Sequence, residues 1–145
     1  NCGVDFIVLD HISIVISGME GGDERRSIDN LMTMLRSVVE ETNVGMLLIS
    51  HLRRASGDKG HEDGAQITLS QLRGSGAIAQ LSDAVIGLER NAQSEDEGDR
   101  IRIRVLKNRF GGQLGKADIL QYNHTTGRID LVVTDEEFTD EDSDF

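Results

Sequence analysis

Two apolar segments flank one amphipathic segment in the N-terminal third of the chain, and this order restricts the fold more than any other feature. Residues 4–9 and 44–50 are almost continuously apolar, which is typical of buried parallel strands. Between them, apolar residues recur at helical spacing from Ile28 to Val39, and acidic residues favour a helix start near Asp23. Strand, helix and strand in this order predict the crossover unit of a parallel α/β sheet.

The second half of the chain predicts shorter elements and a change to antiparallel pairing. A helix is expected over 70–81, interrupted near Gly74–Gly76, and a third apolar strand over 84–89. Residues 100–107 alternate strictly between two faces, as a strand does. Two more antiparallel strands are expected over 116–122 and 128–132, joined by a turn at 124–127. The predicted class is α/β, with a parallel sheet, flanking helices and a C-terminal antiparallel extension.

The charge of the chain is unevenly distributed. The net charge is −11, but seven of the 26 acidic residues lie in residues 134–145, which hold no basic residue. We therefore expect a folded domain over 1–133 and a disordered acidic tail over 134–145. With the tail set aside, clustered bases can still present a local positive surface to nucleic acid.

Several classes of protein are disfavoured by composition. No apolar run approaches the roughly 20 residues of a membrane helix, so no membrane association is expected. The single cysteine, Cys2, cannot form an internal disulfide, which fits a reducing cytoplasm. The four histidines lack the spacing of a zinc site.

Polar residues follow both apolar strands of the crossover unit. Asp10 ends the first strand, and Ser50 and His51 end the second. Ligands of open α/β sheets bind at the carboxyl ends of strands, and an acid there holds the magnesium of a nucleotide in P-loop NTPases. The phosphate-binding pattern G-x-x-x-x-G-K-[ST] does not occur in these residues. We expect part of a longer ATP-driven protein, although ordinary polar strand ends remain an alternative.

Two basic, flexible segments are candidates for contact with a nucleic-acid backbone. The first contains Arg53, Arg54 and Lys59 among small residues, and the second is Arg73-Gly74-Ser75-Gly76. Cationic side chains and accessible backbone N–H groups bind phosphates without reading sequence. A solvated loop and a tight turn, respectively, are the alternatives.

Four further residues are candidates for nucleotide contact. Lys107 and Arg109 lie one residue apart at the end of a predicted strand, so they point the same way and can engage one phosphate group. Tyr122, the only tyrosine, can stack on a base with Arg90 on its other face. A solvated cation pair and ordinary packing of the tyrosine are the alternatives.

Taken together, these motifs resemble the C-terminal half of RecA-like ring helicases of the DnaB family. The likeness is greatest to the helicase–primases of short-tailed bacteriophages of the T-seven type. The residues that carry it lie at 6–15, 48–52, 72–77, 83–91 and 107–112. The resemblance implies a partial RecA-like P-loop NTPase core and a helicase driven by ATP or dTTP with Mg²⁺. It further implies a homohexamer that moves along single-stranded DNA at a replication fork, in the cytoplasm of an infected bacterial host if the gene is phage-encoded.

The resemblance also implies roles for individual residues. Asp10 matches the acid that coordinates Mg²⁺ through water, and His51 matches the histidine that couples hydrolysis to DNA grip. Arg109 matches the arginine finger that enters the neighbouring subunit's nucleotide site, with Lys107 as its companion. Arg90 and Tyr122 match the pair that sandwiches the base.

The remaining implied roles concern DNA and a partner protein. The DNA-facing residues are Arg53, Arg54, Lys59, Arg73, Gly74, Ser75 and Gly76. The acidic tail ending in Phe145 resembles the segment that docks a phage DNA polymerase.

Features of the family are missing from these residues, and two other functions remain open. The P-loop and the catalytic glutamate of the family have no counterpart here, so the chain alone is expected to be inactive. A RecA-type recombinase shares the same core and DNA-facing loops. A non-catalytic module that binds polymerase through its tail is the third possibility.

Overall fold

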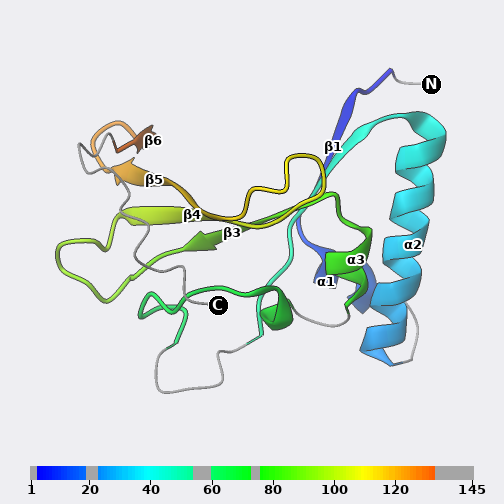
Figure 1. Ribbon diagram of the computed structural model, residues 1–145, viewed down its shortest axis with the longest axis horizontal. Coiled ribbons are helices and arrows are strands. Elements are labelled where there is room, and N and C mark those ends of the chain that lie inside the picture. The colour runs from blue at the N-terminus through cyan, green and yellow to red at the C-terminus, as the bar shows by residue number, and fades with distance from the viewer. Residues whose placement is uncertain (1–2, 19–22, 54–59, 73–75, 133–145) are drawn as a thin grey trace.

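The computed structural model describes residues 3–18, 23–53, 60–72 and 76–132, which form a mixed α/β fold. Figure 1 shows the helices gathered at one end, with the longer strands extending away from them. The elements in chain order are β1 (Phe6–Leu9), α1 (Ile12–Ser17), α2 (Glu24–Thr42), β2 (Gly45–Leu48), the 3-10 turn η1 (Leu69–Gln71), α3 (Ala77–Leu81), β3 (Ala84–Glu89), β4 (Arg100–Asn108), β5 (Gly115–Asn123) and β6 (Arg128–Leu131).

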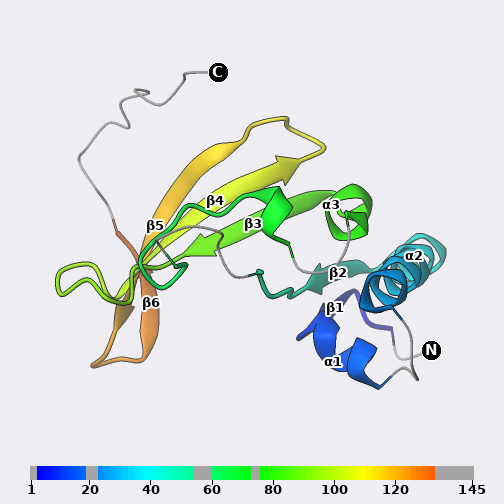
Figure 2. The same ribbon diagram turned by 90° about the horizontal axis from the view of Figure 1, so that it is seen from below.

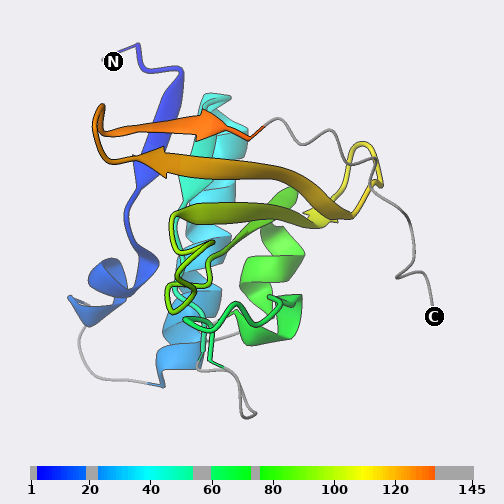
Figure 3. The ribbon, with the colours of Figure 1, turned by 90° about the vertical axis from the view of Figure 1, so that its left-hand side faces the viewer.

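The strands form two sheets. β1 and β2 pair in parallel, in a register that runs from Phe6 opposite Gly45 to Leu9 opposite Leu48. Together with α2 they confirm the predicted strand–helix–strand unit. β3, β4, β5 and β6 form a separate antiparallel sheet in that order, which Figure 3 shows in front of α2. The third apolar strand, β3, therefore belongs to the antiparallel sheet.

The long helix α2 begins and ends where its sequence predicts. The side chain of Asp23 accepts a hydrogen bond of 3.0 Å from the backbone N–H of Arg25, which caps the N-terminus. At the other end Asn43 adopts a left-handed conformation with φ 55°, a common way to terminate a helix. Ile28, Leu31 and Met32 lie on one buried face. Capping and apolar spacing thus agree, as expected for an amphipathic helix.

The hydrophobic core lies among the three helices. Its buried side chains are Ile12 of α1, Ile28, Leu31 and Met32 of α2, and Ile78 of α3. The sequence did not predict α1, because its residues Ile-Ser-Ile-Val-Ile-Ser have low helix propensity. Ile12 is only 2% exposed, so tertiary packing supports this helix.

The expectation that the first strand is buried is wrong. Phe6 and Val8 on β1 are more than half exposed, and so are Ile86 and Leu88 on β3. In both strands exposed residues alternate with less exposed ones. A strand is buried on both sides only when another layer covers each face, and the described residues cover one face of these strands.

A groove lies between the two sheets. It has a volume of about 530 Å³ and is lined by residues of α2, β2, α3 and β3. Within the described residues, β2 pairs only with β1 and β3 only with β4, so each has an edge without a neighbouring strand. Figure 2 shows β2 next to β1, and β3 extending away from α3. The lining is mostly aliphatic, so the groove combines apolar side chains with two strand edges.

The other face of β3 is covered by the segment 60–72. Ile67 of this segment is 3% exposed. It packs closely over Gly87 of β3, since a Cβ atom added to Gly87 would lie 3.5 Å from Cγ2 of Ile67. Glu89 accepts a hydrogen bond of 2.9 Å from the backbone N–H of Ile67 and forms an ion pair of 2.6 Å with Nε of Arg104 on β4. A single buried carboxylate therefore ties this segment to the antiparallel sheet.

The predicted turn between the last two strands is confirmed. Residues 124–127 connect β5 to β6, with Gly127 at φ 69°. Asn123 stabilises the turn, since its side-chain oxygen accepts hydrogen bonds of 3.0 Å and 3.1 Å from the backbone N–H groups of Thr125 and Thr126. The acidic tail lies outside the described residues, so the division at residue 134 stays a prediction.

Candidate functional site

The carboxyl ends of β1 and β2 meet at one edge of the parallel sheet. The pairing continues past the strands, because the N–H of Ile49 donates to the carbonyl of Leu9 at 3.0 Å. Asp10 and His51 follow this pairing and are both exposed. The parallel register therefore brings the two residues to the same edge. Their roles in nucleotide binding stay predictions.

A second histidine, His11, belongs to this edge and was given no role by the sequence. The rings of His11 and His51 lie edge to face, with centroids 4.2 Å apart and planes at 72°. Nδ1 of His11 is buried and has no hydrogen-bond partner in the described structure. The sequence did offer a signal for His11: it follows Asp10 directly after an apolar strand, where any polar side chain lies near the carboxyl edge of the sheet.

The donor set at this edge is compatible with magnesium bound to a nucleotide. Among the described residues, no group of three or more His, Cys, Asp or Glu side chains can hold a metal ion. Magnesium is commonly bound through one or two carboxylates together with substrate phosphates and water. The single exposed carboxylate of Asp10 fits that mode.

The two basic segments begin side by side. Leu52 and Leu72 form an antiparallel bridge, and the N–H of Arg53 donates to the carbonyl of Gln71 at 2.8 Å. Gly76 is the N-cap of α3. Five of the predicted DNA-contacting residues lie outside the described residues: Arg54, Lys59, Arg73, Gly74 and Ser75. The structure thus brings together the starts of both segments, while their DNA contacts stay predictions.

Lys107 and Arg109 both reach the C-terminal end of α3. Nζ of Lys107 donates to the carbonyls of Ala79 at 2.6 Å and Gln80 at 3.1 Å. This contact satisfies carbonyls that lack partners at a helix end. Arg109 donates to the carbonyl of Gln80 at 3.5 Å and pairs with Asp83 at 2.8 Å. The prediction that the two cations point the same way is confirmed.

Asp83 connects α2 to the end of β4. Its Oδ2 atom lies 2.8 Å from NH1 of Arg36, and its Oδ1 atom lies 2.8 Å from NH1 of Arg109. The backbone N–H of Arg109 also donates to the carbonyl of Asp83 at 2.9 Å. The hydrogen bond from Arg36, followed by the charges of both arginines, lowers the pKa of the Asp83 carboxyl.

This lowered pKa predicts a dependence of stability on pH. The ion pairs of Asp83 contribute to folding above its ordinary pKa of 3.8 and are lost as pH falls through the lowered value. Asp83→Asn removes this contribution at every pH. In urea unfolding, the difference in unfolding free energy between the wild type and Asp83→Asn should be constant above about pH 5 and shrink below about pH 4. A difference that stays constant down to pH 2 would contradict the ionised pairing.

Arg90 and Tyr122 share contacts with Asp99. A guanidinium nitrogen of Arg90 lies 3.6 Å from Oδ1 of Asp99, and the backbone N–H of Tyr122 donates to the carbonyl of Asp99 at 3.0 Å. His124 accompanies them, with its ring edge to face against Tyr122 and its Nε2 atom 2.8 Å from Oδ2 of Asp99. The predicted base-binding pair is therefore gathered around one loop residue.

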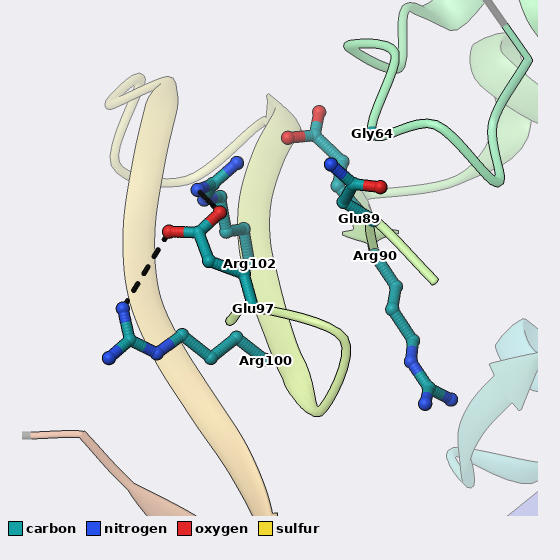
Figure 4. A pocket seen from close by; sticks show the side chains of 7 residues that line it. Gly64, Glu89, Arg90, Glu97, Arg100 and Arg102 are labelled. Carbon is teal, nitrogen blue, oxygen red and sulfur yellow. Dashed lines mark hydrogen bonds and ion pairs between the residues drawn. The ribbon is translucent and has the colours of Figure 1, made fainter. Parts of the chain in front are cut away.

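The cavity next to Arg90 is too small for a base. Its volume is about 10 Å³, which is space for about one water molecule. Figure 4 shows Glu97 held between Arg100 and Arg102 there, while the Arg90 side chain extends away from that group. A base would thus have to bind on the open surface beside Arg90 and Tyr122.

Within one chain, the carboxyl edge and the cation pair are separated. Figures 2 and 3 both show α1, which follows Asp10, far from the connection 109–114 between β4 and β5. The side-chain contacts of Lys107 and Arg109 are likewise with the end of α3 and with Asp83, and not with the carboxyl edge.

The fold corresponds to a known class. Residues 1–130 match the family model of the DnaB-like helicase C-terminal domain. The chain belongs to this family of DnaB-like helicase C-terminal domains.

Curated relatives support the assignment. The chain is 47% identical over 128 residues to the DNA helicase/primase of Enterobacteria phage T3, which covers 88% of the chain and 22% of that protein. It is 27% identical over 133 residues to a probable plasmid replicative DNA helicase of Chlamydia psittaci, which covers 90% of the chain and 28% of that protein. The chain thus spans about a quarter of the length of these relatives.

A solved structure shows the same fold. It is a DnaB-like replicative helicase described with its interactions with primase, and it superposes with a TM-score of 0.69 at 18% identity. The superposition covers 86% of this chain and 30% of the other. Within the described ranges, no helix has the length and apolar character needed to cross a bilayer.

Proposed function

We propose that this chain is part of a replicative DNA helicase that uses ATP or dTTP with Mg²⁺. The observation that carries the proposal is the shared carboxyl edge, to which the parallel register of β1 and β2 brings both Asp10 and His51. This is the edge at which open α/β sheets bind ligands. Family membership supports the same reading, because the matched relatives include replicative helicases.

In this proposal Asp10, His51 and His11 each have a different role at the carboxyl edge. The Asp10 carboxylate accepts hydrogen bonds from the water shell of the magnesium ion. When bound, the ion neutralises charge on the phosphates. His51 hydrogen-bonds the terminal phosphate and changes its partner after hydrolysis. His11 holds the His51 ring through their edge-to-face contact. Because His51 directly precedes the first basic segment, its movement reaches the DNA-contacting residues.

The cation pair serves the neighbouring subunit. Lys107 and Arg109 contact the C-terminal end of α3 and Asp83 rather than the carboxyl edge, so they would complete a nucleotide site across a subunit boundary. A guanidinium there stabilises charge that builds up on the transferring phosphoryl group. A closed homohexamer supplies one such boundary per subunit.

We propose that the helicase moves along single-stranded DNA. The two basic segments follow the bridged residues Leu52 and Leu72, which lie side by side in the described structure. Contacts to phosphates explain movement that does not depend on sequence and binding that weakens with salt. Such a ring acts at a replication fork, in the cytoplasm.

The groove between the two sheets suits a further β-strand. Its two strand edges and aliphatic lining provide backbone hydrogen bonds and apolar contacts to an added strand. We assign this strand to the part of the protein that carries the phosphate-binding loop. That loop would then lie next to the carboxyl edge of β2.

The test compares two aspartates at opposite ends of β1 in the complete protein. Asp10→Asn should lower magnesium-dependent hydrolysis and unwinding by about 10–100-fold, as expected for a group that acts through metal-bound water. Asp5→Asn is the matched control, because Asp5 precedes β1 and its carbonyl, not its side chain, bonds Gly45. Equal activity of the two variants would refute the nucleotide role of the edge.

The base-binding role of Tyr122 has its own test. Tyr122→Ala should weaken nucleotide binding by about 5–150-fold, since an aromatic–base stack contributes about 1–3 kcal/mol. Tyr122→Phe keeps the ring and should bind normally. Fluorescent-nucleotide titration of the complete protein measures both. If Tyr122→Ala bound nucleotide as tightly as the wild type, Tyr122 would not stack on the base.

The proposal includes a contact with a DNA polymerase. This contact depends on the acidic tail and its terminal Phe145, which lie outside the described residues. The support is the excess of negative charge in residues 134–145, which suits a basic partner surface.

A further inference from the structure

The C-terminal end of α3 and Asp83, which follows it, contact Arg109 at several points. The Asp83 carboxylate pairs with the guanidinium at 2.8 Å, and the Asp83 carbonyl accepts from the backbone N–H of Arg109 at 2.9 Å. The carbonyl of Gln80 accepts a third, longer hydrogen bond of 3.5 Å. Both the backbone and the side-chain tip of Arg109 are therefore placed relative to one short segment.

Asp83 is itself fixed from the other side. Its second oxygen lies 2.8 Å from NH1 of Arg36, a residue of the 19-residue helix α2. The side chain of Asp83 is 33% exposed and that of Arg109 is 49% exposed. A carboxylate held by a rigid helix can orient a planar guanidinium by a defined hydrogen bond while leaving its other edge open.

We propose that Asp83 is the positioning residue for Arg109, orienting its guanidinium toward the nucleotide of the neighbouring subunit. This inference rests on the proposed function, in which Arg109 acts across a subunit boundary. Asp83 touches neither nucleotide nor metal in this scheme and acts only through Arg109. Its loss therefore affects turnover and leaves nucleotide binding by the carboxyl edge unchanged, because misplacing a charge-stabilising group by about 1 Å costs roughly 10²-fold in rate.

Glu40 provides a matched control. Its carboxylate lies 2.7 Å from Nε of the same Arg36, so Asp83 and Glu40 share one arginine. In the described structure only Asp83 also contacts Arg109. Asp83→Asn and Glu40→Gln each remove one negative charge beside Arg36, and they differ in the contact with Arg109.

The experiment is a double-mutant cycle in the complete protein, with kcat and KM for hydrolysis measured on single-stranded DNA. Asp83→Asn should lower kcat by roughly 10²-fold at unchanged KM, whereas Glu40→Gln should turn over normally. When Arg109→Ala is already present, adding Asp83→Asn should change kcat by less than about threefold, because a residue that acts only through Arg109 has nothing left to orient.

The outcomes separate the positioning role of Asp83 from the role of Arg109 at the neighbouring subunit. Normal kcat in Asp83→Asn together with a large loss in Arg109→Ala overturns the positioning role and leaves the proposed function intact. A full additional loss in the double variant also overturns it. Normal kcat in Arg109→Ala overturns both. If Asp83→Asn does not fold, Asp83→Glu decides instead, because it keeps the charge but displaces the guanidinium; normal turnover by that variant overturns the inference.

Discussion

Replacing Arg109 with alanine in the complete protein should lower the rate of nucleotide hydrolysis by at least about 10³-fold, the effect of removing an arginine finger in phosphoryl transfer. Nucleotide binding should persist, because Asp10 and His51 lie at a separate edge of the same chain. Arg109→Lys should also be strongly impaired, since a lysine keeps the charge but lacks the planar donor fork. Steady-state hydrolysis with saturating DNA measures both variants.

Arg128→Ala is the control for this prediction. Arg128 is an exposed cation at the start of β6, and its backbone N–H donates to the hydroxyl of Thr126. Removing its charge tests whether any loss of positive charge on the antiparallel sheet reduces turnover. Near-normal hydrolysis by Arg109→Ala, or an equal loss in both variants, would contradict a specific role of Arg109.

The second large effect concerns stability. Replacing Glu89 with alanine should lower the free energy of unfolding by about 3–5 kcal/mol, because it leaves the buried Arg104 charge unpaired. The side chains of Glu89 and Arg104 are 6% and 12% exposed, so the charge of Arg104 loses its partner in a largely desolvated place. The same substitution removes the acceptor for the N–H of Ile67. Urea unfolding of the chain, monitored by circular dichroism, provides the measurement.

Glu97→Ala is the matched variant. Glu97 also pairs with arginines, Arg100 and Arg102, but its side chain is 35% exposed. Partly solvated pairs contribute about 0–1 kcal/mol, so this variant should unfold near the wild-type midpoint. If the two glutamate variants lost similar stability, burial of the Glu89 pair would not be its source.

Arg109 and Glu89, the residues of these two predictions, both belong to a set of elements that connects the DNA-facing segments to the cation pair. Glu89 fixes the segment 60–72, which ends next to the second basic segment, to the antiparallel sheet. Lys107 and Arg109, at the end of β4 in that sheet, donate hydrogen bonds to carbonyls at the C-terminal end of α3. Helix α3 begins at Gly76, a predicted DNA-contacting residue. The DNA-facing segments and the cation pair are thus linked through a few short, hydrogen-bonded elements.

The sequence by itself determined the elements that depend on near neighbours. Helix α2 begins at its Asp23 cap and ends at Asn43, and β3 has the predicted bounds Ala84–Glu89. The turn before β6 follows from Asn123 and Gly127. Capping bonds, apolar spacing and turn residues act within about four positions along the chain, so they can be recognised in the sequence without knowledge of the tertiary structure.

The candidate site could be read only in part. Asp10 and His51 were found because both follow apolar strands, a pattern visible along the chain. Their location at one edge of the sheet depended on the parallel register, which the crossover unit implies. His11 and Asp83 were missed, since a lone polar residue next to a strand gives no local signal of what it will contact. Asp83 gains its significance from Arg36, which is 47 positions away.

Tertiary structure alone decided which face of each strand is covered, which sheet β3 joins, and that α1 is helical. Apolar composition marks β1 and β3 as strands, yet Phe6 and Ile86 are exposed because no described element covers them. The residues of α1 favour a strand locally, but burial of Ile12 against α2 stabilises a helix there. Local patterns report short-range preferences of the backbone, whereas pairing and burial depend on contacts between distant segments.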